Sequence, residues 1–176
     1  LTVIERQLKR MMTLVDNLFA MTAQHSYDFN DTVDFDRMFR DIIAELTPRI
    51  REKNLEINLH HSGFHTIANS VMLTRAFSNL VENAVKYNIE GGRIDISTES
   101  EDKRYVITIA DNGIGIPSEK LENIFKPFYR ADESRSGTDG AGLGLAIASE
   151  IITAHGGTIS ARSQEGQTVF TVMLPI

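Results

Sequence analysis

Residues 79–88 read NLVENAVKYN, and this stretch predicts one helix with two unlike faces. At 3.6 residues per turn, its polar side chains recur at steps of three and four and share one face, namely Asn79, Glu82, Asn83 and Lys86. Apolar side chains take the other face, namely Leu73, Phe77, Leu80, Val81 and Ala84. Amide and carboxylate oxygens suit a hard cation such as magnesium, and an amine suits a phosphate. An amphipathic helix with a solvated polar face would show the same pattern, so both interpretations stay open.

The composition is that of an ordinary globular protein, with 41% apolar and 24% charged residues in a chain of 176. This length suffices for one domain with its own core and an additional element. The formal charge of −6 and a pI near 5.4 argue against a nucleic-acid partner. There are no cysteines, which excludes disulfides and thiolate zinc sites, and the five histidines lack metal-site spacing.

The chain starts at Leu1, without a signal-peptide pattern and without the run of roughly 18 apolar residues that a membrane helix needs. We therefore expect a fragment of a longer protein. Apolar residues from Leu1 to Leu18 alternate steps of three and four, which is the heptad seam of a coiled coil. Because about three heptads need a partner, we favour another helix over packing on the chain's own domain. Residues 27–34 predict a linker that leads into a short strand.

Periodicity predicts the remaining elements. Helices are expected at residues 36–54, 71–88 and 142–154, and strands at 55–59, 65–68, 94–98, 105–110, 158–163 and 168–174. Asp34 or Asp36 can cap the first helix, and Pro48 should kink or destabilise it. Residues 130–141 are rich in charge, Gly, Ser and Thr, which is typical of a mobile loop. The expected fold class is α/β (α+β): a two-layer sandwich of three helices on a mixed, mostly antiparallel five-strand sheet, preceded by the heptad helix.

A second motif, DNGIGIP at residues 111–117, directly follows an expected strand. Asp-Asn-Gly alone is a common hairpin turn, which stays an alternative. Such a turn needs neither a second glycine nor an Ile-Pro pair that ends the next strand. Gly113 and Gly115 would let a flat ring approach the backbone, and Asp111 could accept a hydrogen bond from an exocyclic amine such as that of adenine.

A third motif, GAGLGLAI at residues 140–147, opens a helix. Glycine-rich backbone at a helix N-terminus offers N–H groups and a partial positive charge to phosphates. The motif lacks the Gly-Lys-Ser/Thr of a Walker loop and the preceding strand of a dinucleotide fold, so alone it is a weak signal.

A fourth motif, IFKPFYR at residues 124–130, precedes the expected loop. Its aromatic residues would anchor the near end of that loop and leave Lys126, Arg130 and Arg135 able to reach a phosphate. A surface aromatic cluster with solvated bases is the alternative.

In this order and spacing, the four motifs closely resemble the N, G1, F and G2 boxes of sensor histidine kinases, which share an ATPase superfamily with gyrase B, Hsp90 and MutL. The resemblance covers about residue 30 to the C-terminus, and the F box favours kinases. Residues 1–26 look like the second helix of the dimerisation and phosphotransfer hairpin. By this resemblance, residues 27–34 are a linker with a short strand, and residues 35–176 are an ATP-binding catalytic domain with a lid at about 130–144.

The resemblance implies ATP and Mg²⁺ as cofactors. Asn79 and Asn83 would hold the metal directly or through water, Lys86 would contact the phosphates, and Tyr87 would pack beside the nucleotide. Asp111 would bind the adenine amine. The remaining residues implied at the nucleotide are Gly113, Gly115, Ile116, Lys126, Arg130, Arg135, Gly140, Gly142, Leu143 and Gly144. The implied catalytic residues are Glu82, Asn83, Lys86 and Arg130, with Glu82 assisting phosphoryl transfer.

Two departures from the family pattern stand out. Glu165-Gly166-Gln167 has one glycine where the family has Gly-x-Gly, which concerns a turn. The acceptor histidine of the family is followed by Glu or Asp and then by Arg and Thr-Pro, and none of the five histidines has that setting. His25, for example, lies at the end of the second hairpin helix. The chain is therefore expected to bind ATP but not to autophosphorylate alone.

The implied reaction transfers the γ-phosphoryl group of Mg·ATP to a histidine in two-component signal transduction, through positioning and charge neutralisation. Implied partners are the acceptor-histidine helix of the same kinase and the receiver domain of a response regulator. The parent is expected to be a membrane-anchored homodimer with this domain in the cytoplasm. The alternative is a serine-directed kinase of the anti-sigma-factor type or a regulatory ATP-binding module, which the heptad helix disfavours. A pseudokinase is disfavoured because every box keeps its polar residues.

Overall fold

The structure is a computed structural model that describes residues 28–130, 142–164 and 166–176. The expected heptad helix at 1–26 and most of the expected lid lie outside the described residues. In the described part of the chain, no helix has both the length and the apolar character that a membrane crossing requires.

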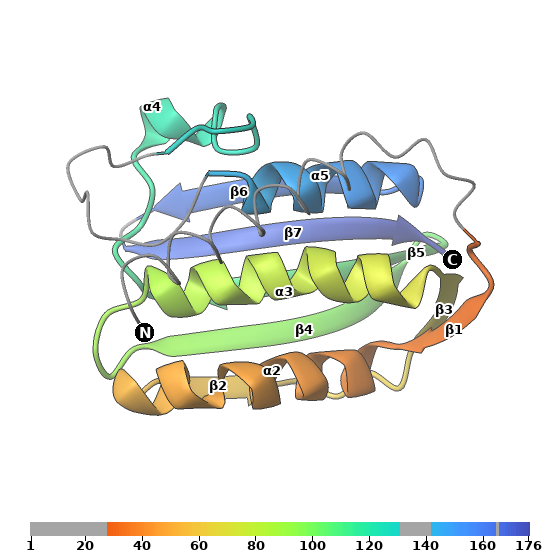
Figure 1. The fold of residues 1–176 in the computed structure, drawn as a ribbon, viewed down its shortest axis with the longest axis horizontal. Coiled ribbons are helices and arrows are strands. Elements are labelled where there is room, and N and C mark those ends of the chain that lie inside the picture. Colours follow the sequence, from red (N-terminus) through yellow and green to blue (C-terminus); the bar gives the residue numbers. More distant parts are fainter. Residues whose placement is uncertain (1–27, 131–141, 165) are drawn as a thin grey trace, which may run out of the picture.

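Three helices cover one face of a five-stranded sheet (Figure 1). The helices are α2 (Phe35–Glu52), α3 (Ser70–Lys86) and α5 (Gly144–Ala154). The sheet order is β2-β4-β5-β7-β6, with β2 at Glu56–Leu59, β4 at Arg93–Glu101, β5 at Arg104–Asp111, β6 at Thr158–Gln164 and β7 at Gln167–Pro175. Only the β2–β4 pair in this sheet is parallel. The predicted two-layer sandwich with a mixed, mostly antiparallel sheet is confirmed.

Two strands and one short helix lie outside this sheet and its three covering helices. β1 (Asp31–Asp34) and β3 (His65–Ala68) pair with each other in an antiparallel sheet of their own. The short α4 (Ser118–Leu121) was not predicted, because it carries no periodic apolar pattern. It follows Pro117, whose fixed φ suits the start of a helix.

The core lies between α3 and the sheet. All five apolar side chains that the sequence places on one face of α3 are at most 1% exposed. They meet the inward residues of the central strands, among them Ile94, Ile96, Ile107, Ile109 and Phe170. Burial of one such side chain stabilises the fold by about 1.5–3 kcal/mol. The apolar face of α3 therefore fixes the direction in which its polar face points.

A two-residue turn sets the register of the central hairpin. Asp102 and Lys103, between β4 and β5, have φ values of 45° and 62°, as a type I′ turn requires. Ile107, Ile109 and Asp111 alternate along β5 and are all buried on the helix side. The same alternation that builds the core thus carries a carboxylate into it at the end of β5.

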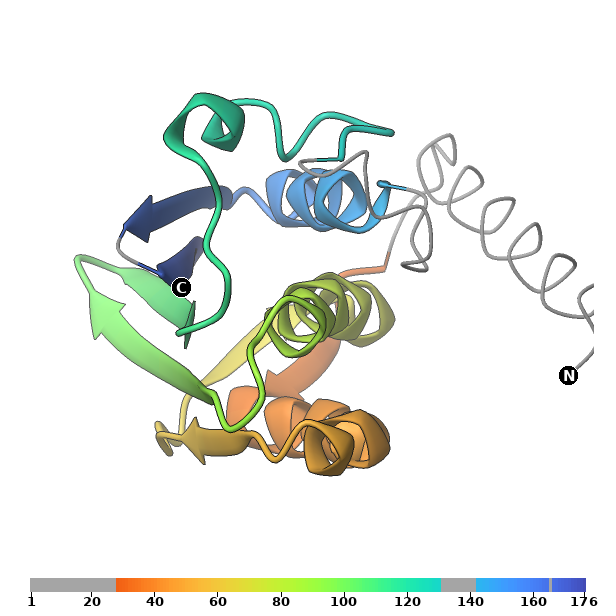
Figure 2. The same cartoon turned by 90° about the vertical axis from the view of Figure 1, so that its left-hand side faces the viewer.

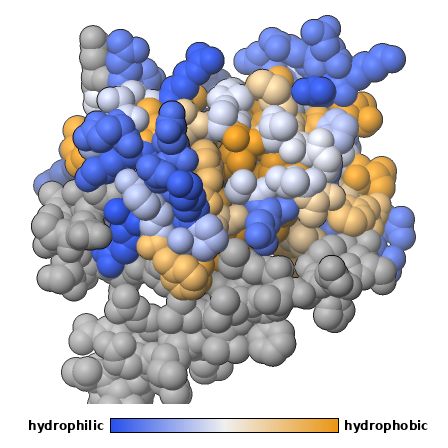
Figure 3. Space-filling model, turned by 90° about the horizontal axis from the view of Figure 1, so that it is seen from above, coloured by the Kyte–Doolittle hydropathy of each residue, from blue (hydrophilic) through white to orange (hydrophobic). Residues whose placement is uncertain are grey.

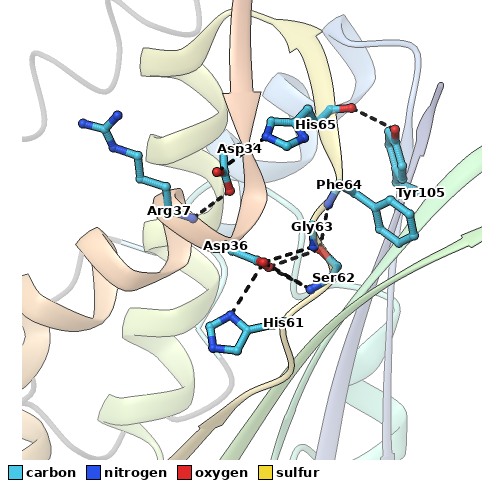
Figure 4. Close-up of polar contacts among 9 residues, drawn as sticks. All are labelled: Asp34, Asp36, Arg37, His61, Ser62, Gly63, Phe64, His65 and Tyr105. Carbon is cyan, nitrogen blue, oxygen red and sulfur yellow. Dashed lines mark hydrogen bonds and ion pairs between the residues drawn. The ribbon is translucent and has the colours of Figure 1, made fainter.

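The start of α2 is fastened to the loop before β3, and we call the contacts around Asp36 the clasp (Figure 4). The Asp36 carboxylate accepts hydrogen bonds from the backbone N–H groups of Ser62 and Gly63, at 3.0 and 3.1 Å, and from the Ser62 hydroxyl at 3.1 Å. His61 Nδ1 lies 3.6 Å from it. Asp34 caps α2 by accepting from the Arg37 N–H at 2.9 Å, so of the two predicted caps Asp34 is confirmed.

The segment from α4 to residue 130 packs onto the sheet edge at β6 through apolar contacts. Ile124 is buried, and the Phe125 ring meets Phe170 of β7 edge-on at 6.4 Å between centroids. Seen from the α4 side, apolar residues gather between two hydrophilic regions (Figure 3). The sequence predicts that the aromatic residues of the motif at 124–130 anchor this segment. The prediction is confirmed for Phe125, whereas Phe128 is 63% exposed.

Candidate functional site

The four motifs meet at one end of the sandwich. α3 and β5 end there, α5 begins there, and the segment after β5 runs past them, on the left of Figure 1 and facing the viewer in Figure 2. The eight residues of α3 from Asn79 to Lys86 span about 10 Å along the helix axis. The polar face of α3 thus forms one wall of this end, with the turn after Asp111 beyond its C-terminus.

Asp111 is the buried carboxylate of this end, with 5% of the residue exposed. Burial raises the pKa of its carboxyl group to about 6, because the charged form is poorly solvated. The Gly113 N–H donates to Asp111 Oδ1 at 2.9 Å and offsets part of that effect. A buried carboxylate that accepts one N–H can accept a further hydrogen bond, as the predicted adenine contact at Asp111 requires.

The turn after Asp111 is locked to the end of α3. The Ile114 N–H donates to the Tyr87 carbonyl at 3.1 Å. A Cβ at position 113 would collide with that carbonyl and would lie 2.8 Å from Asp111 Oδ1, so only glycine fits. The close approach at Gly113 is thus to the chain's own Tyr87 carbonyl, and it joins the first motif to the second. The approach of a flat ring to this backbone stays a prediction.

The other side of the turn rests on the β6–β7 hairpin. Gly115 has a φ of 74°, and the following Ile116 N–H donates to the Ser163 hydroxyl at 2.8 Å. Gly166, with a φ of 78°, makes the hairpin turn and approaches Gly115. A single glycine at this hairpin thus suffices for the positive φ at position 166, and position 165 lies outside the described residues.

The polar face of α3 divides between its two neighbouring helices. The Asn79 side chain faces α5, where a Cβ at Gly144 would lie 3.4 Å from Asn79 Oδ1. Glu82 instead forms an ion pair with Arg49 of α2. The Lys86 ammonium lies over the Tyr87 ring, 5.1 Å from its centroid. The sequence predicts one shared face, and the structure adds that Glu82 stands at its border.

The fourth motif joins the third at the start of α5. The Phe128 N–H donates to the Gly142 carbonyl at 2.9 Å, and Gly142 has a φ of 71°. Leu143 is buried, so it serves the core here. Among the predicted bases, Lys126 is exposed and Arg130 is half-buried. The remaining two predicted residues, Arg135 and Gly140, lie outside the described residues.

Lys53 positions this end of the molecule, and sequence reasoning missed it. Its ammonium donates to the carbonyls of Val85, Lys86 and Asn88, at 3.1, 2.6 and 3.1 Å. These carbonyls end α3, where a cation is favourable. The lysine lies just past α2, 32 to 35 residues away, so no local pattern could have identified it.

Asn88 is the last residue of the first motif, and the sequence pattern predicts no role for it. It is 6% exposed, and its side chain accepts from the Ile89 N–H at 2.9 Å and donates to the Arg93 carbonyl at 3.2 Å. An asparagine directly after a helix, before a Gly-Gly pair, is a recognisable turn signal. Lys53 and Asn88 together hold the exit from α3 beside Gly113.

The sequence of residues 68–176 matches the family described as histidine kinase-, DNA gyrase B-, and HSP90-like ATPases. The chain is 34% identical to the sensor histidine kinase RppB of Synechocystis over 183 residues, a match that covers 98% of this chain and 40% of RppB. The chain therefore spans less than half the length of this curated relative.

Solved structures of histidine kinases are also similar to this chain. A full-length ShkA structure in complex with AMPPNP matches with a TM-score of 0.81 at 26% identity, covering 97% of this chain and 36% of that one. The histidine kinase ThkA in complex with the response regulator protein TrrA matches with a TM-score of 0.79 at 25% identity, covering 98% and 49%. The chain thus belongs to the histidine kinase-, gyrase B- and HSP90-like ATPases. Within them it carries the ATP-binding catalytic domain of a sensor histidine kinase of two-component signalling.

The residues present fit a nucleotide. Asp111 is a buried carboxylate that accepts a hydrogen bond from the Gly113 N–H, and so suits the exocyclic amine of a base. The start of α5, a helix N-terminus with Gly144 as its first residue, lies beside the Asn79 side chain of α3. The candidate base contact, Asp111, and the candidate phosphate contact at the start of α5 thus lie at different places beside α3.

Proposed function

We propose that this chain transfers the γ-phosphoryl group of Mg·ATP to a histidine supplied by another segment or chain, as part of a longer sensor kinase. The observation that carries the proposal is the junction of four motifs at one end of the sandwich. The Asn79 side chain lies beside Gly144 of α5. The Phe128 N–H donates a hydrogen bond to the Gly142 carbonyl, and the Ile114 N–H donates one to the Tyr87 carbonyl.

The roles follow from chemistry and position. Asp111 accepts the adenine amine, with Gly113, Gly115 and Ile116 shaping that pocket. Asn79 and Asn83 would hold Mg²⁺, which neutralises phosphate charge when bound. Lys86 and Arg130 contact phosphate oxygens, and Glu82 assists the acceptor. Further phosphate contacts are proposed for Lys126, Arg135, Gly140, Gly142, Leu143 and Gly144, and Tyr87 packs beside the nucleotide.

The acceptor histidine is proposed to lie outside this chain. His155 is unsuited to the role, because its Nε2 accepts from the Asn69 N–H at 3.3 Å and its Nδ1 lies 2.7 Å from the Ile151 carbonyl. Both ring nitrogens are thus engaged, and burial lowers its pKa. None of the other four histidines has the acidic residue that follows the acceptor in the family.

The domain boundaries remain those expected from the sequence. We propose a partial dimerisation and phosphotransfer hairpin at 1–26, a linker with a short strand at 27–34 and the catalytic domain at 35–176, with a lid at about 130–144. The structure of ThkA with TrrA supports a response regulator as the downstream partner. Homodimerisation of the parent, and its anchoring in the cell membrane with this domain on the cytoplasmic side, stay predictions.

One experiment tests the proposal. The chain is incubated with ATP labelled in the γ-phosphate, alone and with a separate acceptor-histidine hairpin from a sensor kinase of the same family. We expect label on the hairpin only, acid-labile and alkali-stable, as a phosphohistidine is. Acid-stable label on serine would instead establish the anti-sigma-factor type of kinase. ATP binding without any transfer would leave a regulatory module, and self-labelling of the chain would contradict the missing acceptor.

A further inference from the structure

Lys53 directly follows α2, and it contacts the exit from α3 with both its side chain and its main chain. The half-buried side chain donates to the carbonyls of Val85, Lys86 and Asn88, which match the three N–H donors of an ammonium group. The Lys53 carbonyl accepts the Gly91 N–H at 2.9 Å. The loop after α3 runs down to the end of α2 (Figure 1). One residue thus holds this loop from two sides.

The carbonyl of Tyr87 belongs to the same stretch of backbone, but it serves the turn after β5. The carbonyls on either side of it, those of Lys86 and Asn88, accept from Lys53. The Tyr87 carbonyl instead accepts the Ile114 N–H at 3.1 Å. Because peptide units are rigid planes, a change in the neighbouring carbonyls also turns this one. The Lys53 contacts therefore set the direction of the hydrogen bond to Ile114.

Gly113 packs directly against this stretch of backbone. A Cβ at position 113 would collide with the Tyr87 carbonyl and would lie 3.0 Å from the Asn88 Cα. The Gly113 N–H donates to Asp111 Oδ1 at 2.9 Å, and this hydrogen bond orients the carboxylate. A continuous series of close contacts thus runs from the Lys53 ammonium to the Asp111 carboxylate.

The stability of the α2–α3 contact has a separate source at the other end of α2. The buried rings of Phe39 and Phe77 meet edge-on at 5.2 Å between centroids. Phe39 lies near the start of α2 and Lys53 follows its end, so the two are about 20 Å apart along the helix. A substitution at Phe39 can therefore destabilise the domain without altering the contacts of Lys53.

We propose that Lys53 is a positioning residue for recognition of the nucleotide base, acting through the turn at Gly113 on the Asp111 carboxylate. The inference rests on the proposed function, which assigns the adenine amine to Asp111. By holding the exit from α3, Lys53 keeps Gly113 where its N–H orients the carboxylate before a nucleotide binds. Such preorganisation lowers the cost of binding. Loss of the Lys53 ammonium therefore weakens the base contact and leaves the phosphate contacts at α5 unchanged.

The test is a double-mutant cycle on the full chain, in which calorimetry gives the Kd values of AMP, ADP and ATP. The variants are Lys53→Met, which keeps the length of the side chain without its charge, Asp111→Asn and the double variant. Lys53→Gln is a milder variant that retains an amide donor. Arg51→Met is the matched control, since Arg51 is an exposed base in the last turn of α2. Phe39→Leu is the control for stability, and melting temperatures are measured for all variants.

We expect Lys53→Met to weaken AMP, ADP and ATP by the same factor, about tenfold, and Lys53→Gln to weaken them by about threefold. In the Asp111→Asn background, Lys53→Met should cost less than about a further twofold. The amide NMR signals of Gly113 and Ile114 should shift in Lys53→Met. Phe39→Leu should lower the melting temperature but keep all three Kd values within about twofold of the wild type. Arg51→Met should match the wild type.

Three results would overturn the role of Lys53: unchanged Kd values in Lys53→Met, an equal loss in the Asp111→Asn background, or a loss confined to ATP. An equal loss of affinity in Phe39→Leu would also overturn it, since the effect would then be one of stability. If Lys53→Met does not fold, Lys53→Gln decides by the same criteria.

The proposed function fails in a different way. A wild-type chain that binds none of the three nucleotides would overturn the proposed function together with this inference. Binding without transfer of phosphate to the acceptor hairpin would contradict the proposed reaction alone, because the role of Lys53 is measured by binding.

Discussion

Asp36 and Asp111 are two carboxylates of one domain whose surroundings shift their pKa values in opposite directions. Burial raises the pKa of Asp36, but the Ser62 and Gly63 N–H groups, the Ser62 hydroxyl and His61 outweigh it, so the net pKa is lowered (Figure 4). Burial raises the pKa of Asp111 to about 6, and a single N–H, that of Gly113, opposes it. Asp36 has its hydrogen-bond donors within the chain, whereas Asp111 still lacks most of the donors that a buried carboxylate needs.

We propose that the difference separates a structural carboxylate, Asp36, from a ligand-binding one, Asp111. The clasp fastens loop 60–64 to the start of α2, and its charge is balanced inside the fold. At the end of β5, by contrast, the fold buries the Asp111 carboxyl group, whose ionised form destabilises the nucleotide-free protein. Such a group persists where a ligand supplies the missing partner.

The largest difference between the two carboxylates is expected in the free energy of unfolding when each aspartate, Asp111 or Asp36, is replaced by asparagine. At pH 7.5, Asp111→Asn should raise the free energy of unfolding of the nucleotide-free protein by up to about 3 kcal/mol, since a carboxyl group raised from 3.8 to about 6 is stabilising only while protonated. Its contribution is complete below pH 3.8 and is lost as the pH rises through about 6, so the gain should vanish near pH 4.

Asp36→Asn should instead lower the free energy of unfolding by about 2 kcal/mol at pH 7.5, because a charged acceptor of several hydrogen bonds is lost. Its lowered pKa makes the native contribution greatest above pH 3.8, so this loss should shrink in acid. Urea unfolding from pH 4 to 8 measures both variants. Shifts of the same sign at pH 7.5 would remove the distinction between the two carboxylates.

The next largest effect is expected at Asn83 of α3, which we propose as a ligand of Mg²⁺. Asn83→Ala should weaken Mg²⁺-dependent ATP binding by more than the roughly 10–100-fold that loss of an outer-sphere partner costs. The control is Asn58→Ala, which removes an amide that bonds Asp95 on the neighbouring strand. Calorimetry with Mg²⁺ and with chelator measures the affinity. An unchanged affinity in Asn83→Ala would count decisively against its metal role.

If Asp111 contacts the adenine base, its replacement should weaken nucleotide binding by the same factor whatever the number of phosphates. Asp111→Asn should weaken ATP, ADP and AMP alike, by about 10- to 100-fold, because a charge-assisted hydrogen bond is lost. Asp36→Asn should bind all three within about twofold of the wild type. If only ATP binding suffered in Asp111→Asn, the assignment of this carboxylate to the base would be wrong.

The smallest effect is expected at Arg130. Arg130→Ala should slow transfer to the acceptor hairpin by about tenfold while weakening ADP by no more than about twofold, since a γ-phosphate contact has no counterpart in ADP. Single-turnover labelling and ADP titration measure the two. Equal losses in both would refute a role at the γ-phosphate.

Local pattern predicted the fold, and it identified motifs that the structure brings together at one end of the sandwich. The 3.6-residue repeat of α3, the alternation of β5 and the glycines after Asp111 each act over a few residues, so they can be read from the sequence alone. The convergence of the motifs at one end of the fold favours the nucleotide interpretation over the alternatives, and a sequence indicates that convergence only through resemblance.

Pairings across long sequence separations were out of reach. Lys53 caps α3 from 32 to 35 residues away, and Arg49 reaches Glu82 across 33. Asp36 was read as a possible helix cap, but the Ser62–Gly63 backbone takes its carboxylate instead. Each of these side chains satisfies a local rule equally well without its distant partner, so only the packed structure identifies the contact.

The central claim is that the Asp111 carboxylate accepts a hydrogen bond from a bound nucleotide. The titration of Asp111 tests this claim most directly. Carboxyl carbon NMR follows Asp111 and Asp36 from pH 3 to 8, with and without saturating ADP. We predict a midpoint of about 6 for Asp111 without ADP, a clear fall when the adenine amine donates to the carboxylate, and no response of Asp36. A midpoint near the ordinary 3.8, or one that ADP leaves unmoved, would contradict the account.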